Sequence, residues 1–500
     1  MKLKTALALV IFMIYSLFFH RTFVLSFEHD PFWLNLEDRF RVETWNTFDK
    51  SIPRDFEDNY TFYANRFRLG AGYKQSLFEV FGQYQVSSLS SLPDLPGFGT
   101  GVLYQTFNSG TETHMTKGTI NQLYVKSKIP SLEELSLKVG RFDYNDGLET
   151  IPTDPSLKWL KEFRISQRMI GTFDWSHTGR SFDGFQSAYD QPWYNATVTA
   201  VRPTQGGFQM DQDQTIHDID LLAGVFTLKN SDKFKNSDAR LFYYFYNDTR
   251  DADCVGNRTF SSLKCVGPVR TDNTVGRAKF EANKGNLEVH SIGANVLHTI
   301  PTGDYGIVDL LAWGVYQTGD WGKLDHEAFG TAVEAGYKFK TIPWQPWFRT
   351  GYYYGSGDED PVDSSHETFF QVLPTPRVYA LTPLYNLMNN QDYFFMVLLN
   401  PLDKVKFRGD LHKVWIADDQ DRWYAGAGAQ HESNEFGYAG TPSFKRNELL
   451  TIADASISFA ATSFLDLNAY YSRAWGNDII EANFDDDNSH FFYLELVLHF

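Results

Sequence analysis

Basic side chains recur at alternate positions in several short segments, and this spacing could recognise anions. One residue separates Arg39 from Arg41, and one residue separates Arg66 from Arg68. In an extended strand alternate side chains point to the same face, so the members of each pair would share a face. A guanidinium can bind a carboxylate or a phosphate through two parallel hydrogen bonds. The basic residues expected on polar strand faces are Arg39, Arg41, Arg66, Arg68, Arg349, Lys406 and Arg408.

Acidic residues accompany these basic faces, which leaves two interpretations open. The acidic residues are Glu37, Glu43, Asp410 and Glu495. If the faces line a pore, arginine and lysine side chains form an electropositive constriction that favours anions. Alternatively, the opposite charges form an internal ladder of ion pairs that stiffens a wall and needs no solute. A single arginine fits either interpretation, and the cluster as a whole favours a role in a solute pathway.

Catalytic chemistry finds little support in the sequence. His177, His217, His412 and His431 are scattered, and no Gly-x-Ser-x-Gly elbow is present. A catalytic pair carried on two strands would leave almost no sequence signal, so a membrane hydrolase stays open as a less favoured alternative. We predict no catalytic residue, no cofactor and no enzyme activity.

Two acidic clusters and two cysteines are expected in loops. Asp358–Asp360 and Asp485–Asp487 could offer oxygen ligands to calcium, but neither has the spacing of an EF-hand. Solvated acidic loops are the favoured interpretation, and no metal ligand is predicted. Cys254 and Cys265 lie close together in a polar stretch and are expected to form one loop-closing disulfide.

The composition favours a membrane barrel over a helical membrane protein or a nucleic-acid partner. Mean hydropathy is −0.36, and no apolar run long enough for a spanning helix follows the N-terminus. Aromatic residues make up 16% of the chain, as in barrels whose Tyr and Trp rings form interfacial girdles. The formal charge of −17 excludes the basic footprint that binding to nucleic acid requires.

Apolar and polar residues alternate in segments of about 10 residues along most of the chain, as in transmembrane barrel strands. Both ends of a single-chain barrel lie in the periplasm, so the number of strands is even, and about 18 are expected. We therefore predict an all-β fold, a transmembrane antiparallel β-barrel with long extracellular loops and short periplasmic turns. The expected strands are 33–44, 59–74, 76–87, 118–128, 134–145, 182–190, 193–203, 217–229, 238–248, 288–300, 307–319, 325–340, 345–356, 391–400, 403–416, 448–461, 464–475 and 490–500. The long outer loops are expected at 88–117, 146–181, 249–287, 357–390 and 417–447.

The two ends of the chain suggest export and insertion into an outer membrane. Residues 1–26 carry a basic start and an apolar stretch, which predicts a signal peptide before a barrel domain at 27–500. The last strand alternates an apolar stripe with a mixed one and ends on Phe500. The expected partners are outer-membrane lipids and lipopolysaccharide, and the barrel-assembly machinery through this strand.

Three segments carry a resemblance to the alginate-export family of outer-membrane barrels. They are Gly140–Gly147, Arg164–Gly171 and Trp175–Gly184, within which Arg-Ser-Phe-Asp-Gly at 180–184 matches the family pattern closely. Weaker similarity extends through 334–337, 354–358, 408–412 and 491–494. The family has Gln where this chain has Phe142, so a polar role at that position does not carry over.

The resemblance implies an 18-stranded barrel with an arginine-rich lumen for an anionic polysaccharide or a similar solute. The positions that match its motifs are Arg141, Arg164, Arg168, Arg180 and Asp183. They could contact solute, or Arg180 and Asp183 could pin a loop inside the barrel. Strand alternation carries Arg141 to the lipid face, unless a bulge near Gly140 shifts it.

The leading hypothesis is an outer-membrane channel for anionic or polar solutes. The alternative is a receptor that captures a ligand with its outer loops, for which the 357–390 loop offers aromatic side chains. These are Phe369, Phe370, Tyr379 and Tyr385.

Overall fold

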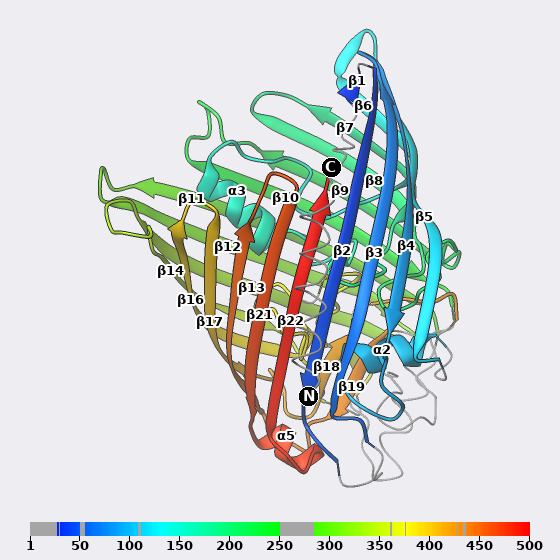
Figure 1. Ribbon diagram of the computed structural model, residues 1–500, viewed down its shortest axis with the longest axis vertical. Coiled ribbons are helices and arrows are strands. Elements are labelled where there is room, and N and C mark those ends of the chain that lie inside the picture. Colours follow the sequence, from blue (N-terminus) through cyan, green and yellow to red (C-terminus); the bar gives the residue numbers. More distant parts are fainter. Residues whose placement is uncertain are drawn as a thin grey trace, which may run out of the picture.

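Eighteen antiparallel strands form one closed wall around a lumen (Figure 1). This computed structural model describes residues 28–29, 31–50, 56–108, 112–250, 285–360, 363–375, 377–426, 428–433 and 437–500. Each wall strand pairs with the next along the chain, and the last, β22, pairs with the first, β2. That closing register runs from Glu37 opposite His499 to Asn46 opposite His490. Closure satisfies the backbone hydrogen bonds of every strand, which a sheet in a bilayer requires.

All eighteen strands expected from the alternation are present. The wall consists of β2 (Phe32–Asn46), β3 (Asn59–Lys74), β4 (Phe78–Ser90), β5 (His114–Ile129), β6 (Leu132–Phe142), β7 (Phe182–Asp190), β8 (Tyr194–Pro203), β9 (Ile219–Leu228), β10 (Ser237–Asp248), β11 (Leu287–Pro301), β12 (Gly306–Trp321), β13 (Leu324–Phe339), β14 (Trp347–Gly355), β16 (Asn390–Leu402), β17 (Val405–Trp415), β20 (Glu448–Ala460), β21 (Leu465–Gly476) and β22 (Asn488–His499). Some bounds differ from the prediction. β5 begins at His114, earlier than expected, because its polar first residues pair with β4 without an apolar alternation.

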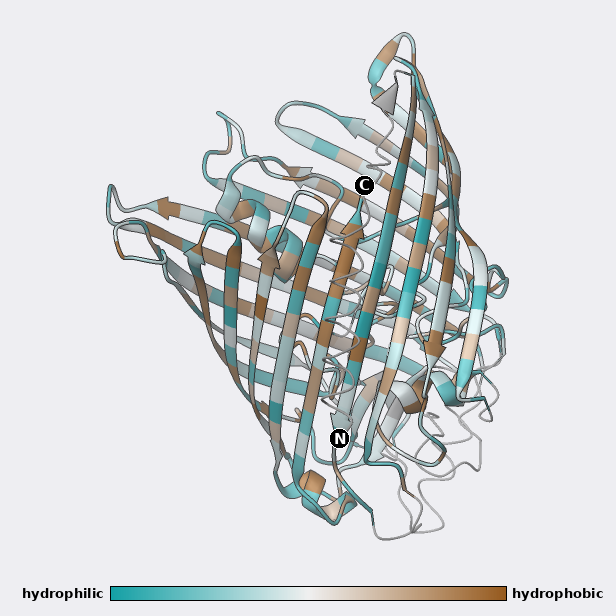
Figure 2. Cartoon of the chain, viewed as in Figure 1, coloured by the Kyte–Doolittle hydropathy of each residue, from teal (hydrophilic) through white to brown (hydrophobic). Residues whose placement is uncertain are grey.

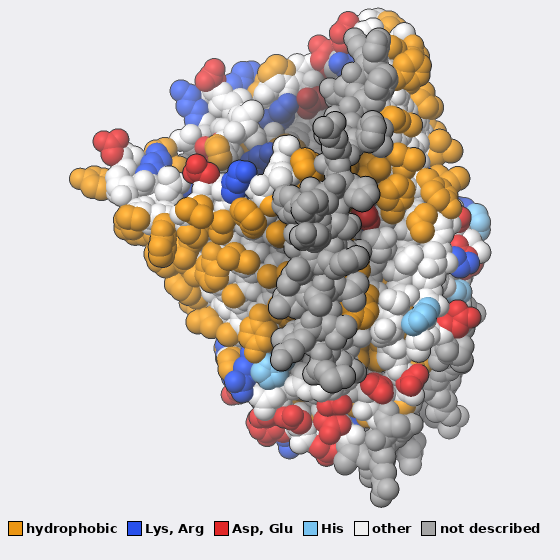
Figure 3. All heavy atoms as spheres, viewed as in Figure 1, with side chains coloured by type: hydrophobic (Ala, Val, Ile, Leu, Met, Phe, Trp, Pro, Cys, Tyr) orange, Lys and Arg blue, Asp and Glu red, His pale blue; other side chains and the backbone are white. Residues whose placement is uncertain are grey.

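Side chains on each strand alternate between the outward face and the lumen. On β13, for example, Val333 is 59% exposed whereas Ala332 is 1% exposed. Outward-facing side chains such as Leu411 and Leu241 make the outer surface apolar. Figure 2 shows hydrophobic and hydrophilic residues alternating along the strands, and Figure 3 shows hydrophobic side chains gathered over the outside of the wall. Such a surface suits lipid contact. Among the described residues, no helix is long and apolar enough to cross a bilayer.

The two rims of the barrel differ in their connections. At one rim, short turns such as that between Lys74 and Phe78 join the strands, and the barrel's first and last strands begin and end there. We call it the short-turn rim. The opposite, long-loop rim carries α2 (Thr100–Phe107), α5 (Asp478–Asn483) and the hairpin of β18 (Arg422–Gly426) and β19 (Tyr438–Pro442), near the lower end of the barrel in Figure 1. The two-residue strands β1 (Glu28–His29) and β15 (Ser365–His366) complete the sheet.

Residues 143–181 turn back from the long-loop rim into the lumen, and we call them the inserted segment. The segment contains α3 (Pro155–Leu160) and a π-helical turn, η1 (Lys161–Ile165). Asp154 caps α3 by accepting hydrogen bonds from the backbone N–H groups of Ser156 and Leu157. The Trp159 ring packs on Trp347, at the short-turn end of β14, so the segment extends through the lumen toward the short-turn rim. The sequence had predicted an outer loop here.

A second stretch, residues 363–375 and 377–389, lies inside the barrel beside the inserted segment, and we call it the 363–389 stretch. Its Leu373 forms a backbone bridge with Ile170, and the Tyr353 hydroxyl on the wall donates to the Leu387 carbonyl at 2.8 Å. Apolar side chains of both stretches pack in one buried cluster with the inner wall. Burial of such surface stabilises the insertion by about 25 cal/mol for each Å² removed from water. This loop also differs from the predicted outer position, because its apolar residues find their partners only inside the closed wall.

Several sequence predictions lie outside the described residues. The predicted signal peptide, residues 1–26, is one of them. Cys254 and Cys265, with most of the predicted 249–287 loop, are another, since residues 251–284 are not described.

Candidate functional site

Four arginines of β2 and β3 point into the lumen and face the inserted segment. Arg39, Arg41, Arg66 and Arg68, which we call the first arginine group, occupy alternate positions of the two strands and are buried. Their inward direction follows from the alternation, because neighbouring residues of the opposite parity, such as Leu69 directly after Arg68, face outward.

The first arginine group binds the inserted segment mainly through Asp174. Arg66 Nη1 and Arg68 Nη2 lie 2.9 and 2.7 Å from Asp174 Oδ1. Arg39 Nη1 donates to the Asp174 backbone carbonyl at 2.8 Å, and its Nη2 donates to the Ser176 carbonyl. The Asp174 side chain is partly exposed. Its partial desolvation raises its pKa, but Arg66, Arg68 and Arg39 outweigh this effect and hold the pKa well below its ordinary value.

Carboxylates of the wall neutralise the rest of the first arginine group. Arg41 Nη2 lies 2.5 Å from Glu495 Oε2 on β22, and its Nη1 lies 3.1 Å from Glu43 Oε1. Glu37 Oε1 lies 2.6 Å from Arg66 Nη2. Glu43 also contacts His177 Nε2 of the inserted segment, at 3.0 Å. The predicted acidic companions therefore meet the predicted arginines.

A second arginine group surrounds Glu334 of β13. Arg164 binds this carboxylate with two hydrogen bonds, Nε to Oε2 at 2.8 Å and Nη2 to Oε1 at 3.0 Å. Arg168 Nη2 lies 3.1 Å from Oε1, and Arg349 Nη2 of β14 lies 3.1 Å from Oε2. Arg349 Nη2 also lies 3.0 Å from Asp309 Oδ1 of β12. Three buried guanidiniums thus share two carboxylates, with one positive charge in excess.

Aromatic rings enclose the second arginine group. Arg164 lies 4.6 Å from the ring centres of both Tyr379 and Phe394, and Arg349 lies 5.3 Å from that of Trp159. Such cation–π contacts are strong where the cation is shielded from water. The group therefore ties the inserted segment and the 363–389 stretch to the wall.

The remaining lumen-facing predictions lie on β17 and in the inserted segment. Arg408 Nε donates to Asp410 Oδ2 at 2.6 Å, and Arg408 Nη2 donates to the Tyr379 carbonyl at 2.8 Å. Lys406 shares their parity but is exposed near the short-turn rim. Arg180 is buried and donates to the Ala429 carbonyl at 3.2 Å, so its place fits the loop-pinning interpretation.

Arg141 and Asp183 lie on the outward face instead of the predicted lumen position. They form a two-bonded pair, with both distances 2.8 Å. The pair lines an outer-surface pocket with Ile120, Leu123 and Val139. The β5–β6 register stays regular from Lys128 to Leu123, so no bulge returns Arg141 to the lumen. Strand alternation therefore outweighs the placement that the motif implied.

The aromatic residues that suggested ligand capture by an outer loop are all inside the barrel. Phe369, Phe370, Tyr379 and Tyr385 are at most 4% exposed. They pack against wall residues and arginines, and so they form no external binding surface.

Three residues that organise this site were absent from the predicted set: Asp174, Asp309 and Glu334. The sequence could have placed Asp309 and Glu334 on the lumen face. Asp309 lies two residues before the buried Leu311 on the same strand face, and Glu334 lies two residues after the buried Ala332. Asp174 had no such signal, since its position depends on the insertion of a loop.

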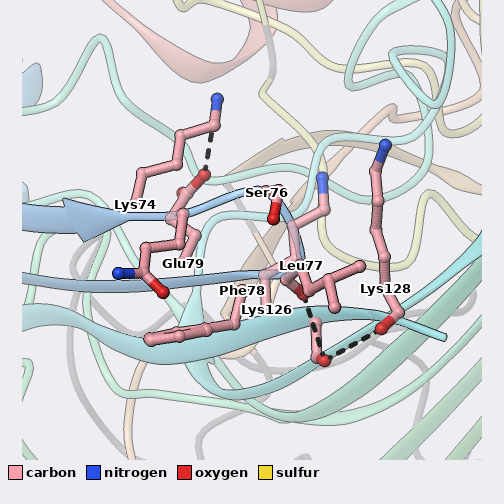
Figure 4. A pocket seen from close by; sticks show the side chains of 9 residues that line it. Lys74, Ser76, Leu77, Phe78, Glu79, Lys126 and Lys128 are labelled. Atoms are coloured by element: carbon pink, nitrogen blue, oxygen red, sulfur yellow. Dashed lines mark hydrogen bonds and ion pairs between the residues drawn. The ribbon is translucent and has the colours of Figure 1, made fainter. Parts of the chain in front are cut away.

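A shallow pocket of about 440 Å³ lies at the short-turn rim, away from both arginine groups (Figure 4). Lys74, Lys126 and Lys128 surround the turn before β4, and Lys74 Nζ lies 3.9 Å from Glu79 Oε2. None of the predicted site residues lines it.

Comparison with solved structures shows similar barrels among porins. The BenF-like porin from Pseudomonas fluorescens Pf-5 matches with a TM-score of 0.55 and 10% identity, over 94% of this chain and 99% of that chain. OccK8 (OprE) from Pseudomonas aeruginosa matches with a TM-score of 0.55 and 9% identity, over 94% and 98%. The outer membrane protein opdK from Pseudomonas aeruginosa gives 0.52 and 8%, over 93% and 98%. Identities this low show a shared fold only.

Sequence comparison supplies the family. Among proteins with curated descriptions, none matches this chain. The model of the family described as alginate export matches residues 99–479, which is most of the chain and contains the motifs at 140–184. The chain therefore belongs to the alginate-export family, and it is a non-enzymatic channel of the bacterial outer membrane.

Proposed function

We propose that this channel passes anionic solutes, and that the inserted segment forms its constriction. The observation that carries the proposal is the convergence of guanidiniums from two walls and from the segment between them. The first arginine group reaches Asp174 from one side, and Arg349 meets Arg164 and Arg168 from the other. An anion that displaces a carboxylate from such a group finds two-bonded partners already in position.

The balance of charge within the ion pairs determines how strongly the channel should prefer anions. Around Asp174, the arginines and carboxylates balance, whereas the second arginine group keeps one positive charge in excess. We therefore place the selective charge at the second group. The description of the family as alginate export makes an anionic polysaccharide one candidate solute, beside smaller carboxylates.

Reversal potentials in planar bilayers under a KCl gradient test the proposal. We expect the wild type to prefer chloride over potassium, and Arg168→Gln to reduce this preference by removing the excess charge. The matched control is Arg202→Gln, because Arg202 pairs with Asp220 on the exposed outer face and should leave the potential unchanged. A potassium preference in the wild type contradicts the proposal, as does an unchanged potential in correctly folded Arg168→Gln.

A further inference from the structure

Three potential metal ligands meet on the lumen side of β17 and β20. Asp410 lies directly opposite Asp454 in the strand register, and His412 follows Asp410 on the same face. All three side chains are buried, with 3%, 6% and 2% of their surfaces exposed. One potential ligand atom from each lies within 4.8 Å of the other two. Among the described residues, this is the only such group of histidine, cysteine and carboxylate side chains.

Each of these side chains has one atom bonded and another without a partner. Arg408 Nε donates to Asp410 Oδ2 at 2.6 Å. Tyr470 and the backbone N–H of Leu381 donate to Asp454 Oδ2 at 2.9 and 3.1 Å. The other oxygens, Asp410 Oδ1 and Asp454 Oδ1, are buried and receive no hydrogen bond from any other residue described, although the two carboxyl groups interact directly with each other. His412 Nε2 is also buried without a hydrogen-bond partner. A buried polar atom without a partner is costly, and a bound cation would give these three converging atoms one partner in common.

Asp392 fixes the histidine in the form that binds metals. His412 Nδ1 lies 3.0 and 3.1 Å from the two oxygens of Asp392, so this nitrogen carries the proton that the carboxylate accepts. The Nε2 lone pair is then free to coordinate an ion. Asp392 itself accepts a hydrogen bond from Tyr385 at 2.6 Å. Carboxylates commonly hold metal-binding histidines in this way.

We propose that Asp410 Oδ1, His412 Nε2 and Asp454 Oδ1 bind a divalent transition-metal cation, with Zn²⁺ the best fit. One imidazole with two carboxylates is a ligand set that zinc accepts, and three protein ligands leave a fourth position for water or solute. The bound cation would also balance charge, because Arg408 is the one Lys or Arg side chain in the described part of the chain that pairs with these carboxylates, and Asp392 adds another negative charge. Zinc bonds of about 2.0–2.2 Å would draw these ligand atoms, which now lie within 4.8 Å of one another, closer together.

Bound zinc would also fasten an inserted stretch to the wall. Leu381 bonds to the ligand Asp454, and Tyr385 bonds to Asp392, which orients His412. Both belong to the 363–389 stretch inside the lumen. The competing state is a proton shared between Asp410 and Asp454, which would need no metal.

Metal binding to the full-length chain, refolded in detergent without a histidine tag, tests the site. Cys254 and Cys265 are blocked first, so that thiols contribute no ligand, and bound metal is removed with a chelator. We expect one Zn²⁺ per chain with micromolar or tighter affinity in a competition assay, and visible absorption bands when Co²⁺ replaces zinc. His412→Gln should weaken binding by 100-fold or more while keeping a donor for Asp392. His298→Gln, on a strand away from the site, should bind as the wild type does.

Two outcomes overturn the proposal. One is a correctly folded wild type that binds no zinc at one per chain and gives no cobalt bands, which is the result expected for a shared proton. The other is unchanged affinity in His412→Gln. The cobalt spectrum of the wild type decides the question even if a variant fails to fold.

Discussion

At the scale of single residues, Glu334 has the most concentrated role in the lumen. Its two oxygens receive Arg164, Arg168 and Arg349, and none of the four side chains is exposed. A buried ion pair gains little over an apolar contact, but removing one partner leaves the others charged without compensation. Glu334 therefore controls how firmly the inserted segment is held.

Replacing Glu334 with glutamine should loosen the inserted segment. The change leaves three buried guanidiniums with Asp309 as their remaining carboxylate, and we expect local opening to become easier by about 3–5 kcal/mol. Hydrogen exchange of the amides in residues 157–170 measures this opening. Glu448→Gln is the control, since its pair with Lys413 is partly exposed and should contribute less than about 1 kcal/mol. Equal protection in the two variants would show that Glu334 does not hold the segment.

Individual residues also show where sequence reasoning ends. Arg349 and Arg408 were placed on the lumen side by strand alternation alone, and the structure puts them there. Arg141 was assigned to the lumen through a motif, and the β5–β6 register, which is regular from Lys128 to Leu123, carries it outward. The alternation of apolar and polar residues reflects the two environments on either face of the wall, so it can be read from the sequence. The partners of a loop carboxylate such as Asp174 depend on where the loop inserts in the folded barrel, and this cannot be read from the sequence.

At the scale of elements, the inserted segment is a loop that docks against the inner face of the barrel wall. Its attachment depends on a histidine as well as on ion pairs. His177 packs against Tyr104 and contacts Glu43, with Arg41 and Arg39 nearby. Burial is the main cause that lowers the pKa of His177 to about 3, and the arginines add to it, whereas Glu43 opposes it.

Mild acid should therefore weaken docking through His177. A free histidine gains its proton near pH 6.5, whereas the docked one stays neutral until about pH 3, so docking loses stability as pH falls below 6.5. At pH 5 the loss amounts to about 2 kcal/mol.

Hydrogen exchange of residues 173–180 at pH 7.5 and pH 5, corrected for intrinsic rates, measures this loss. His177→Gln removes the titrating group and should lack this component of the pH dependence. Asp143 and Asp146, whose pKa burial raises to about 6, act in the opposite direction, but they are present in both proteins. An identical pH response in wild type and variant would contradict the role of His177.

At the scale of the whole molecule, the barrel fold follows from the contrast between the lipid outside the wall and the packed protein inside it. The sequence predicted this wall almost completely, because each strand carries the contrast in its own alternation. It could not predict that two loops fill the lumen, since their apolar residues resemble those of any buried loop. The aromatic content of residues 363–389 was the one local sign that they are not solvated.

A charged substitution on the lipid-facing surface should destabilise the barrel more the deeper it lies in the bilayer. Val333 lies in the middle of β13 and is 59% exposed on the outer surface, so Val333→Arg should destabilise the barrel by about 2–4 kcal/mol. Tyr305→Arg, in a turn at the short-turn rim, should cost at most about 1 kcal/mol. Urea unfolding in lipid vesicles measures both. Similar losses in the two variants would place Val333 outside the apolar part of the bilayer.

The inserted segment also hides an electrical asymmetry of the barrel. Without Asp174, the β2–β3 side would hold Arg39, Arg41, Arg66 and Arg68 against Glu37, Glu43 and Glu495, leaving it positive. Without Arg164 and Arg168, the opposite β12–β14 side would hold Arg349 against Asp309 and Glu334, leaving it negative. Displacing one segment would thus create a transverse field across the open lumen. A passing polyelectrolyte would then be oriented, with its acidic groups turned toward β2 and β3.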